Sequence, residues 1–128
     1  AQGFIPGMTL TGVPALRAAL TGQEGGDPAA VVAKFRAANP GFKPDEHELN
    51  DWGYRLMGFG KPRSGLAVLK LTAELYPDSG NAFDSLGEAY AANGDKPAAI
   101  TAYRKSLALD PGNKNAAQWL EKLEKPAG

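Results

Sequence analysis

The chain of 128 residues has no cysteine, a single histidine and no excess of charge of either sign. Without cysteine it cannot form a disulfide, a thiolate metal site or a cysteine nucleophile. Lysine and arginine together number 14, as do aspartate and glutamate, so no net field attracts a nucleic acid or an acidic membrane surface. The longest apolar runs, such as LAVLKL, fall far short of the roughly 20 residues that span a bilayer. We therefore expect no nucleic-acid partner and no direct insertion into a membrane.

The sequence also lacks the common catalytic motifs. The patterns G-x-S-x-G, S-x-x-K, G-x-x-x-x-G-K and H-E-x-x-H do not occur. His47 and Asp51 would lie on one helical face, but a zinc site takes three or four ligands with supporting partners. A solvated first turn of a helix is the simpler interpretation of this segment. We expect no catalysis, no cofactor and no metal, and keep a minimal metal-dependent site at His47 and Asp51 as the enzyme-class alternative.

A repeated pattern with a period of 34 residues runs through the chain. One position of this repeat holds an aromatic residue or leucine, at Phe35, Leu69 and Tyr103. Another position holds glycine, at Gly26, Gly60 and Gly94. A period of this length is typical of an array of helical hairpins. Further columns pair Trp52 with Leu86 and Gly53 with Gly87. We infer that each period forms one hairpin that stacks on the next.

The apolar spacing and the turn residues predict seven helices. They are expected near residues 13–22, 27–39, 45–59, 61–76, 80–93, 96–109 and 114–125. Leu49, Trp52 and Leu56 are spaced i, i+3, i+7 and would form one inward face. Gly53 and Gly87 interrupt good helices, which suggests that a second helix approaches closely, at the small residues Gly65 and Ala99. The turns GKP and GDKP place glycine after one helix and proline at the start of the next.

The segment AFDSLGEAYAANGDKPAAITAYRKSLALDP resembles the tetratricopeptide repeat. The residues that carry the resemblance are Phe83, Leu86, Gly87, Tyr90, Ala99, Tyr103, Ser106 and Pro111. The segment ELNDWGYRLMGFGKPRSGLAVLKLTAELYP is similar to it in looser form, with Gly65 where alanine is usual and Leu69 in place of the aromatic residue. The resemblance implies an all-α fold, a right-handed α-α superhelix of tetratricopeptide repeats with a C-terminal capping helix.

The domain organisation follows from this frame. We expect an irregular N-terminal arm over residues 1–12, a degenerate first helical hairpin over 13–45, tetratricopeptide repeats over 46–79 and 80–113, and a capping helix and tail over 114–128. The last helix would keep an apolar stripe toward the stack and a charged face toward water, as a terminal cap requires.

A narrower resemblance concerns the segments ELNDWGYRL and VLKLTAELYPDSGNAFDSLGEAY, which are similar to repeat tails behind bacterial serine hydrolases of the β-lactamase and esterase type. In such proteins the tail is an accessory and the chemistry lies in another domain. The start AQGFIPG has no initiator methionine, which suits a mature end left by signal peptidase, and a trimmed tag is the other explanation. We expect a periplasmic or secreted location and leave a cytoplasmic one open.

The resemblance also implies where a partner binds, because the first helix of each tetratricopeptide hairpin lines the inner groove of the array. The positions implied are His47, Asn50, Asp51, Tyr54, Asn81, Asp84, Ser85 and Glu88. Asp84 and Glu88 would repel the peptide carboxylate that the family's lysine- and asparagine-based clamp holds, and that clamp has no counterpart here. Amide, hydroxyl and aromatic groups instead suit a peptide or loop with backbone polar groups or a basic residue.

An apolar N-terminal arm is the second candidate surface, formed by Phe4, Ile5, Met8 and Leu10. This arm would either fill the chain's own groove or anchor in a partner, since an exposed apolar segment is a liability in a monomer. So few repeats lie near the minimum for such stacks, and self-association into a homo-oligomer is a further option. The function expected is a non-catalytic protein-protein interaction module, a small subunit or adaptor of a larger bacterial assembly. The alternative is the C-terminal accessory domain of a serine hydrolase.

Overall fold

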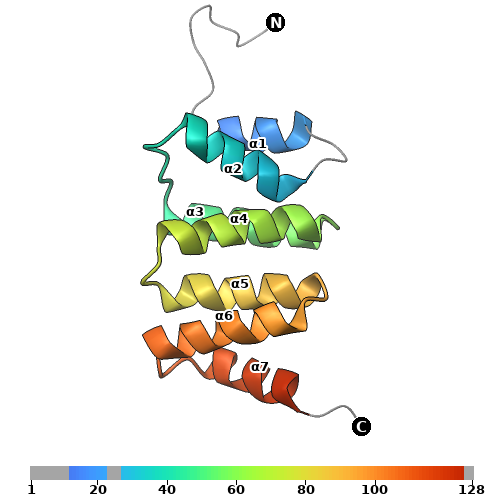
Figure 1. The fold of residues 1–128 in the computed structure, drawn as a ribbon, viewed down its shortest axis with the longest axis vertical. Helices are drawn as coiled ribbons and strands as arrows, with labels where there is room; N and C mark the ends of the chain where they lie inside the picture. Colours follow the sequence, from blue (N-terminus) through green and yellow to red (C-terminus); the bar gives the residue numbers. More distant parts are fainter. Residues whose placement is uncertain (1–11, 23–26, 126–128) are drawn as a thin grey trace, which may run out of the picture. The chain divides into compact units, whose positions relative to one another are not determined.

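The computed structural model describes residues 12–22 and 27–125. Over these ranges the chain forms seven helices and no strand (Figure 1), so the predicted all-α helical-repeat fold is confirmed. The helices are α1 (Gly12–Gly22), α2 (Pro28–Ala38), α3 (Glu46–Gly58), α4 (Pro62–Leu75), α5 (Gly80–Ala92), α6 (Lys96–Leu109) and α7 (Lys114–Glu124). Each begins and ends within two residues of its predicted bounds. None of the helices in these ranges has the length and apolar character needed to cross a bilayer.

The chain divides into two units, residues 1–44 and residues 45–128. In the first unit α1 packs against α2. In the second, α3 pairs with α4 and α5 pairs with α6, α4 packs on α5, and α7 packs on α6 (Figure 1). The arm residues Phe4, Ile5, Met8 and Leu10 lie outside the described residues, as does Gly26 of the glycine column.

Short polar side chains and glycines set the ends of these helices. The side-chain oxygens of the N-cap residues accept hydrogen bonds from backbone N–H groups of the first turn, at Asp27, Asp45, Ser79, Asp95 and Asn113. Gly60 and Gly94 follow α3 and α5 with φ of 77° and 78°, a left-handed conformation that glycine adopts without strain. Proline stands in the first turn of α2, α4 and α6, as the turns GGDP, GKP and GDKP predict.

Close helix packing at the glycines is confirmed in the hairpin of α3 and α4. A Cβ atom on Gly65 would lie 2.8 Å from the carbonyl oxygen of Gly53, so the two backbones touch where the sequence predicts it. A Cβ atom on Gly53 would lie 2.5 Å from Cγ of Leu69. The glycine of α3 therefore makes room both for a backbone and for a buried side chain.

In the hairpin of α5 and α6, the side chain that packs most closely on Gly87 is not that of Ala99, the small residue predicted to face it. The nearest atoms across Gly87 belong to the ring of Tyr103, three of them 2.9 Å from where a Cβ would stand, and none of the three belongs to Ala99. Tyr103 occupies the same repeat column as Leu69, so both glycines accommodate the residue of that column. The larger aromatic side chain explains why it, rather than the small alanine, fills the space.

Two of the apolar clusters in the second unit join successive elements of the stack. One joins the two hairpins through Ala73, Ala82, Leu86 and Ala102, and the other joins α6 to α7 through Ala99, Tyr103, Ala116 and Leu120. The ring of Trp119 stacks on that of Tyr103 at 6.3 Å with an interplanar angle of 4°. Burial of each large apolar side chain in these clusters contributes about 1.5–3 kcal/mol to folding. The last helix thus covers the end of the apolar core with its own apolar stripe.

Candidate functional site

Helices α3 and α5 contact each other directly, and their facing turns carry polar side chains. The Tyr54 hydroxyl on α3 donates a hydrogen bond to Ser85 Oγ on α5 at 3.3 Å. Burial raises the pKa of Tyr54 above its ordinary value, and Glu88, within hydrogen-bonding reach of the same hydroxyl, adds to this rise. Tyr54 therefore stays neutral at physiological pH and links two neighbouring hairpins at their surface.

The carboxylate of Asp84 is held by two amides from the next helical segment. Asn115 donates from Nδ2 to Asp84 Oδ1 at 2.8 Å, and Asn113 donates from Nδ2 to Asp84 Oδ2 at 3.2 Å. Asn113 also donates to the buried hydroxyl of Ser106 at 3.0 Å, and that hydroxyl donates to the Gly80 carbonyl at 2.7 Å. Both donors to Asp84 are neutral, so they orient its carboxylate without cancelling its charge.

The ring of Tyr103 packs beneath α5 at Gly87, which stands next to Glu88 and three residues after Asp84. Tyr103 is fully buried, its ring lies across Gly87, and its hydroxyl has no hydrogen-bond partner among the described residues. Burial raises the pKa of Tyr103, and the charges of Glu88 and Asp84 raise it further. We call Tyr54, Asp84, Ser85, Glu88 and the Tyr103 hydroxyl the polar cluster.

Four of the eight predicted groove residues belong to the polar cluster, and four do not. Asn50 is half-buried, and its buried Oδ1 atom has no hydrogen-bond partner in the part of the chain that the structure describes. His47, Asp51 and Asn81 are exposed, and no side-chain hydrogen bond joins them to another predicted groove residue within the described ranges. Among the same residues no group of three or more histidine, aspartate or glutamate side chains could hold a metal ion.

Three contributors to this surface were missing from the sequence prediction: Asn113, Asn115 and the Tyr103 hydroxyl. Asn115 follows Asn81 by one period of 34 residues, as Asn81 follows His47, so extending the groove column into the last helix would have found it. Tyr103 was assigned to packing alone, because its column is filled by apolar side chains elsewhere in the chain. The sequence did contain one signal: Tyr103 carries a hydroxyl in a repeat column whose other side chains are apolar.

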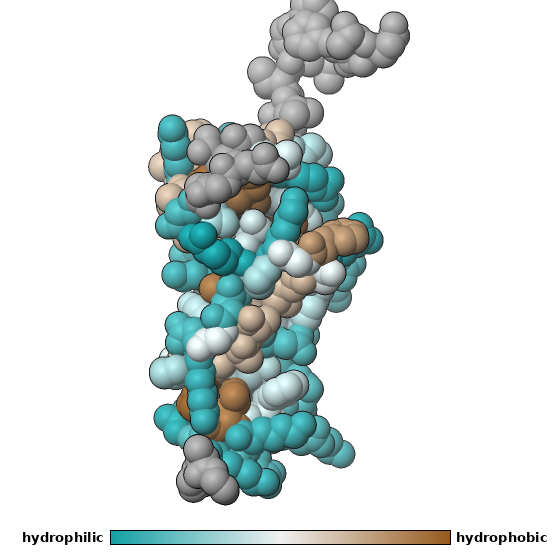
Figure 2. All heavy atoms as spheres, turned by 90° about the vertical axis from the view of Figure 1, so that its right-hand side faces the viewer, coloured by the Kyte–Doolittle hydropathy of each residue, from teal (hydrophilic) through white to brown (hydrophobic). Residues whose placement is uncertain are grey.

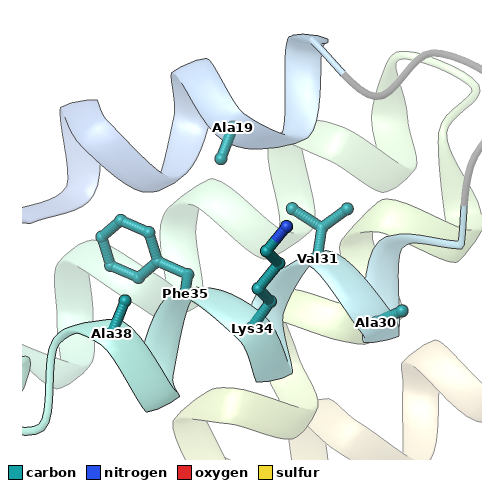
Figure 3. Close-up of a pocket in the computed structure, with 6 residues that line it drawn as sticks. All are labelled: Ala19, Ala30, Val31, Lys34, Phe35 and Ala38. Carbon is teal, nitrogen blue, oxygen red and sulfur yellow. The ribbon is translucent and has the colours of Figure 1, made fainter.

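Two mainly apolar hollows lie elsewhere on the described surface. Figure 2 shows a face that is mainly hydrophilic, with apolar residues in separate patches. In the first unit a hollow of about 390 Å³ lies between α1 and α2, where Val31, Lys34 and Phe35 rise from α2 toward Ala19 (Figure 3). In the second unit a hollow of about 490 Å³ is lined by Phe83, Leu86, Tyr90, Ala98, Thr101, Ala102 and Lys105. Neither contains a predicted groove residue.

The stacked hairpins of the second unit are those of a helical-repeat protein. Residues 80–113 match the family model of the tetratricopeptide repeat, which covers α5, α6 and the turn that follows. Over 62 residues, 48% of the chain, the sequence is 40% identical to the Hsp70-Hsp90 organizing protein of Triticum aestivum. The matched segment spans 11% of that relative's own length. Together these findings support a protein-protein interaction module.

Proposed function

We propose that the chain is a non-catalytic module that binds an extended segment of a partner protein across α3, α5 and the start of α7. The observation that carries this proposal is the bond from Tyr54 to Ser85, which sets side chains of two successive hairpins next to each other. An extended peptide that crosses several repeats needs polar groups spaced along it in this way. The partly buried position of the cluster allows those groups to be desolvated when a peptide covers them.

The chemistry of the cluster bears on the kind of partner. The relative from Triticum aestivum is named as an organizer of Hsp70 and Hsp90. The polar cluster of this chain holds two carboxylates, at Asp84 and Glu88, and no lysine or arginine. Because like charges repel, a partner segment that ends in a carboxylate is disfavoured here. We propose a partner segment of neutral or basic character.

At the level of the whole assembly we propose a small subunit or adaptor of a larger bacterial complex located outside the cytoplasm. The bacterial assignment depends on the resemblance of segments within residues 48–90 to repeat tails of serine hydrolases. The alternative is that the chain is the accessory domain of such a hydrolase. A hydrolase domain encoded in the same reading frame supports the accessory domain, and co-purification with stoichiometric partners from a periplasmic fraction supports the subunit.

The groove proposal is tested with the double variant Tyr54→Ala and Asp84→Ala. A bound partner protein, identified by mass spectrometry after gentle purification, is titrated into the variant and followed by calorimetry. We expect binding at least about tenfold weaker, a loss of about 1.4 kcal/mol, with little change in melting temperature. The matched control is Lys70→Ala with Glu121→Ala, exposed residues of α4 and α7 that lie outside the predicted groove, which should bind normally. Equal affinity of the double variant and the wild type rejects the surface.

A further inference from the structure

We infer that the polar cluster is a subsite for one basic side chain, lysine or arginine, of the bound partner segment. This inference rests on the proposed function, since it names the chemistry that the same surface recognises. Beyond the proposed function, it specifies that the partner segment carries a positive charge, that a lysine or arginine provides this charge, and that this residue binds between α3 and α5. The evidence comes from the charges of the cluster and from one buried hydroxyl.

The first step is the uncompensated negative charge of α5. Asp84 and Glu88 are four residues apart on this helix, a spacing at which like charges destabilise a helix. No lysine or arginine of the described chain forms an ion pair with either residue. A cation placed between the two carboxylates would pair with both.

Three cations of α6 and α7 contact groups outside the polar cluster. Lys105 Nζ lies 5.9 Å from the centroid of the Phe83 ring, and Lys122 Nζ lies 5.0 Å from that of Trp119. Arg104 pairs with Glu124 on the exposed side of α6 and α7. A cation from a partner would therefore meet no ion pair already formed at Asp84 or Glu88 within the described ranges.

The second step is the Tyr103 hydroxyl, which points to a ligand independently of the charges. This hydroxyl is buried and has no partner among the described residues, and its ring packs on Gly87, which stands next to Glu88 and three residues after Asp84. Buried hydroxyls nearly always form hydrogen bonds, because an unpaired one loses its water without compensation. A phenol oxygen can accept a hydrogen bond, and an ammonium or guanidinium group brings several donors. A basic side chain would thus pair with both carboxylates, and it would also satisfy the hydroxyl once the side chains that cover that hydroxyl move aside.

The third step is the rigidity of the acidic groups. The amides of Asn113 and Asn115 fix both oxygens of Asp84, so this carboxylate is oriented before a ligand arrives. Charged groups held in place by neutral donors lose less conformational entropy on binding than mobile surface side chains. The arrangement therefore favours a defined contact with one residue over a diffuse attraction for positive charge.

The test uses a displayed library of random twelve-residue peptides, selected against the full chain. We expect the selected peptides to share a lysine or arginine at one position. Replacing it by norleucine or citrulline should weaken binding at least about tenfold to the wild type but less than about twofold to Glu88→Gln. Glu121→Gln, an exposed position on α7, is the matched control and should behave as the wild type. The peptide substitutions keep the test valid even where a protein variant folds poorly.

Three outcomes would overturn the inference. Peptides that lose binding with Tyr54→Ala but share no basic residue would refute the subsite and leave the proposed function standing. If replacing the basic residue of the peptide weakens binding to Glu88→Gln as much as it weakens binding to the wild type, that residue binds at another site. Failure to select any peptide would refute the groove itself, and the subsite with it.

Discussion

Replacing Gly87 by alanine tests the close contact between Gly87 of α5 and the ring of Tyr103 of α6. An added Cβ would stand 2.9 Å from three atoms of the Tyr103 ring, closer than carbon atoms approach without displacement. The ring has little freedom to move, because it is fully buried and stacked on Trp119 at 6.3 Å. The substitution must therefore shift a helix or force the ring out of its place.

The magnitude follows from two opposing contributions. Alanine is more favourable than glycine in a helix interior by about 1 kcal/mol, which stabilises the variant. Overpacking a well-filled core costs about 1–3 kcal/mol, which destabilises it. The free energy of unfolding of Gly87→Ala should fall by up to about 2 kcal/mol after these contributions are combined.

The control is Gly58→Ala, because Gly58 is helical and no atom lies within 4 Å of its added Cβ. This variant gains up to about 1 kcal/mol from helix propensity and meets no clash. Urea unfolding followed by circular dichroism at 222 nm measures both. A Gly87→Ala protein as stable as Gly58→Ala would refute the assignment of Gly87 to close packing.

Three further predictions concern single groups. Ser106→Ala removes a buried hydroxyl that forms two hydrogen bonds and should lower the free energy of unfolding by about 1 kcal/mol, whereas exposed Thr101→Ala should change it by less than about 0.5 kcal/mol. Gly94→Ala should cost about 1 kcal/mol in the same urea assay because of its φ of 78°, and an unchanged midpoint would contradict this reason. Folding raises the pKa values of Tyr54 and Tyr103, so stability is complete below pH of about 10 and falls as the pH rises above it. The double variant Tyr54→Phe with Tyr103→Phe should lose less stability between pH 9 and pH 11 in alkaline unfolding titrations.

The helices of this chain could be predicted well from the sequence because their signals are local. Gly60 and Gly94 are followed by proline two or three residues later, and these residues end one helix and begin the next for steric reasons that need no tertiary context. The 34-residue period then indicates which helices pair. The partner of Gly87 was predicted less well, since sequence spacing alone does not say which side chain of the facing helix fills a gap.

The candidate site was predicted only in part, for a related reason. The groove column of the repeat identifies Tyr54, Asp84 and Glu88 by position. It does not reveal that Tyr103 passes its hydroxyl across a glycine from the second helix, because that depends on how closely two helices pack. Nor does it reveal that Asn113, a helix cap, also bonds to Asp84, because one amide serves both turn formation and side-chain orientation.

The hydrogen bonds from Asn113 and Asn115 to Asp84 bear on how this repeat could be transplanted. The family match ends at residue 113, so a graft cut at that boundary would omit Asn115 and the helix that begins there. Such a graft would carry the acidic side chain without the amide that holds its Oδ1 atom. A graft of residues 80–125, one repeat together with the helix that follows it, would keep both amides that hold Asp84.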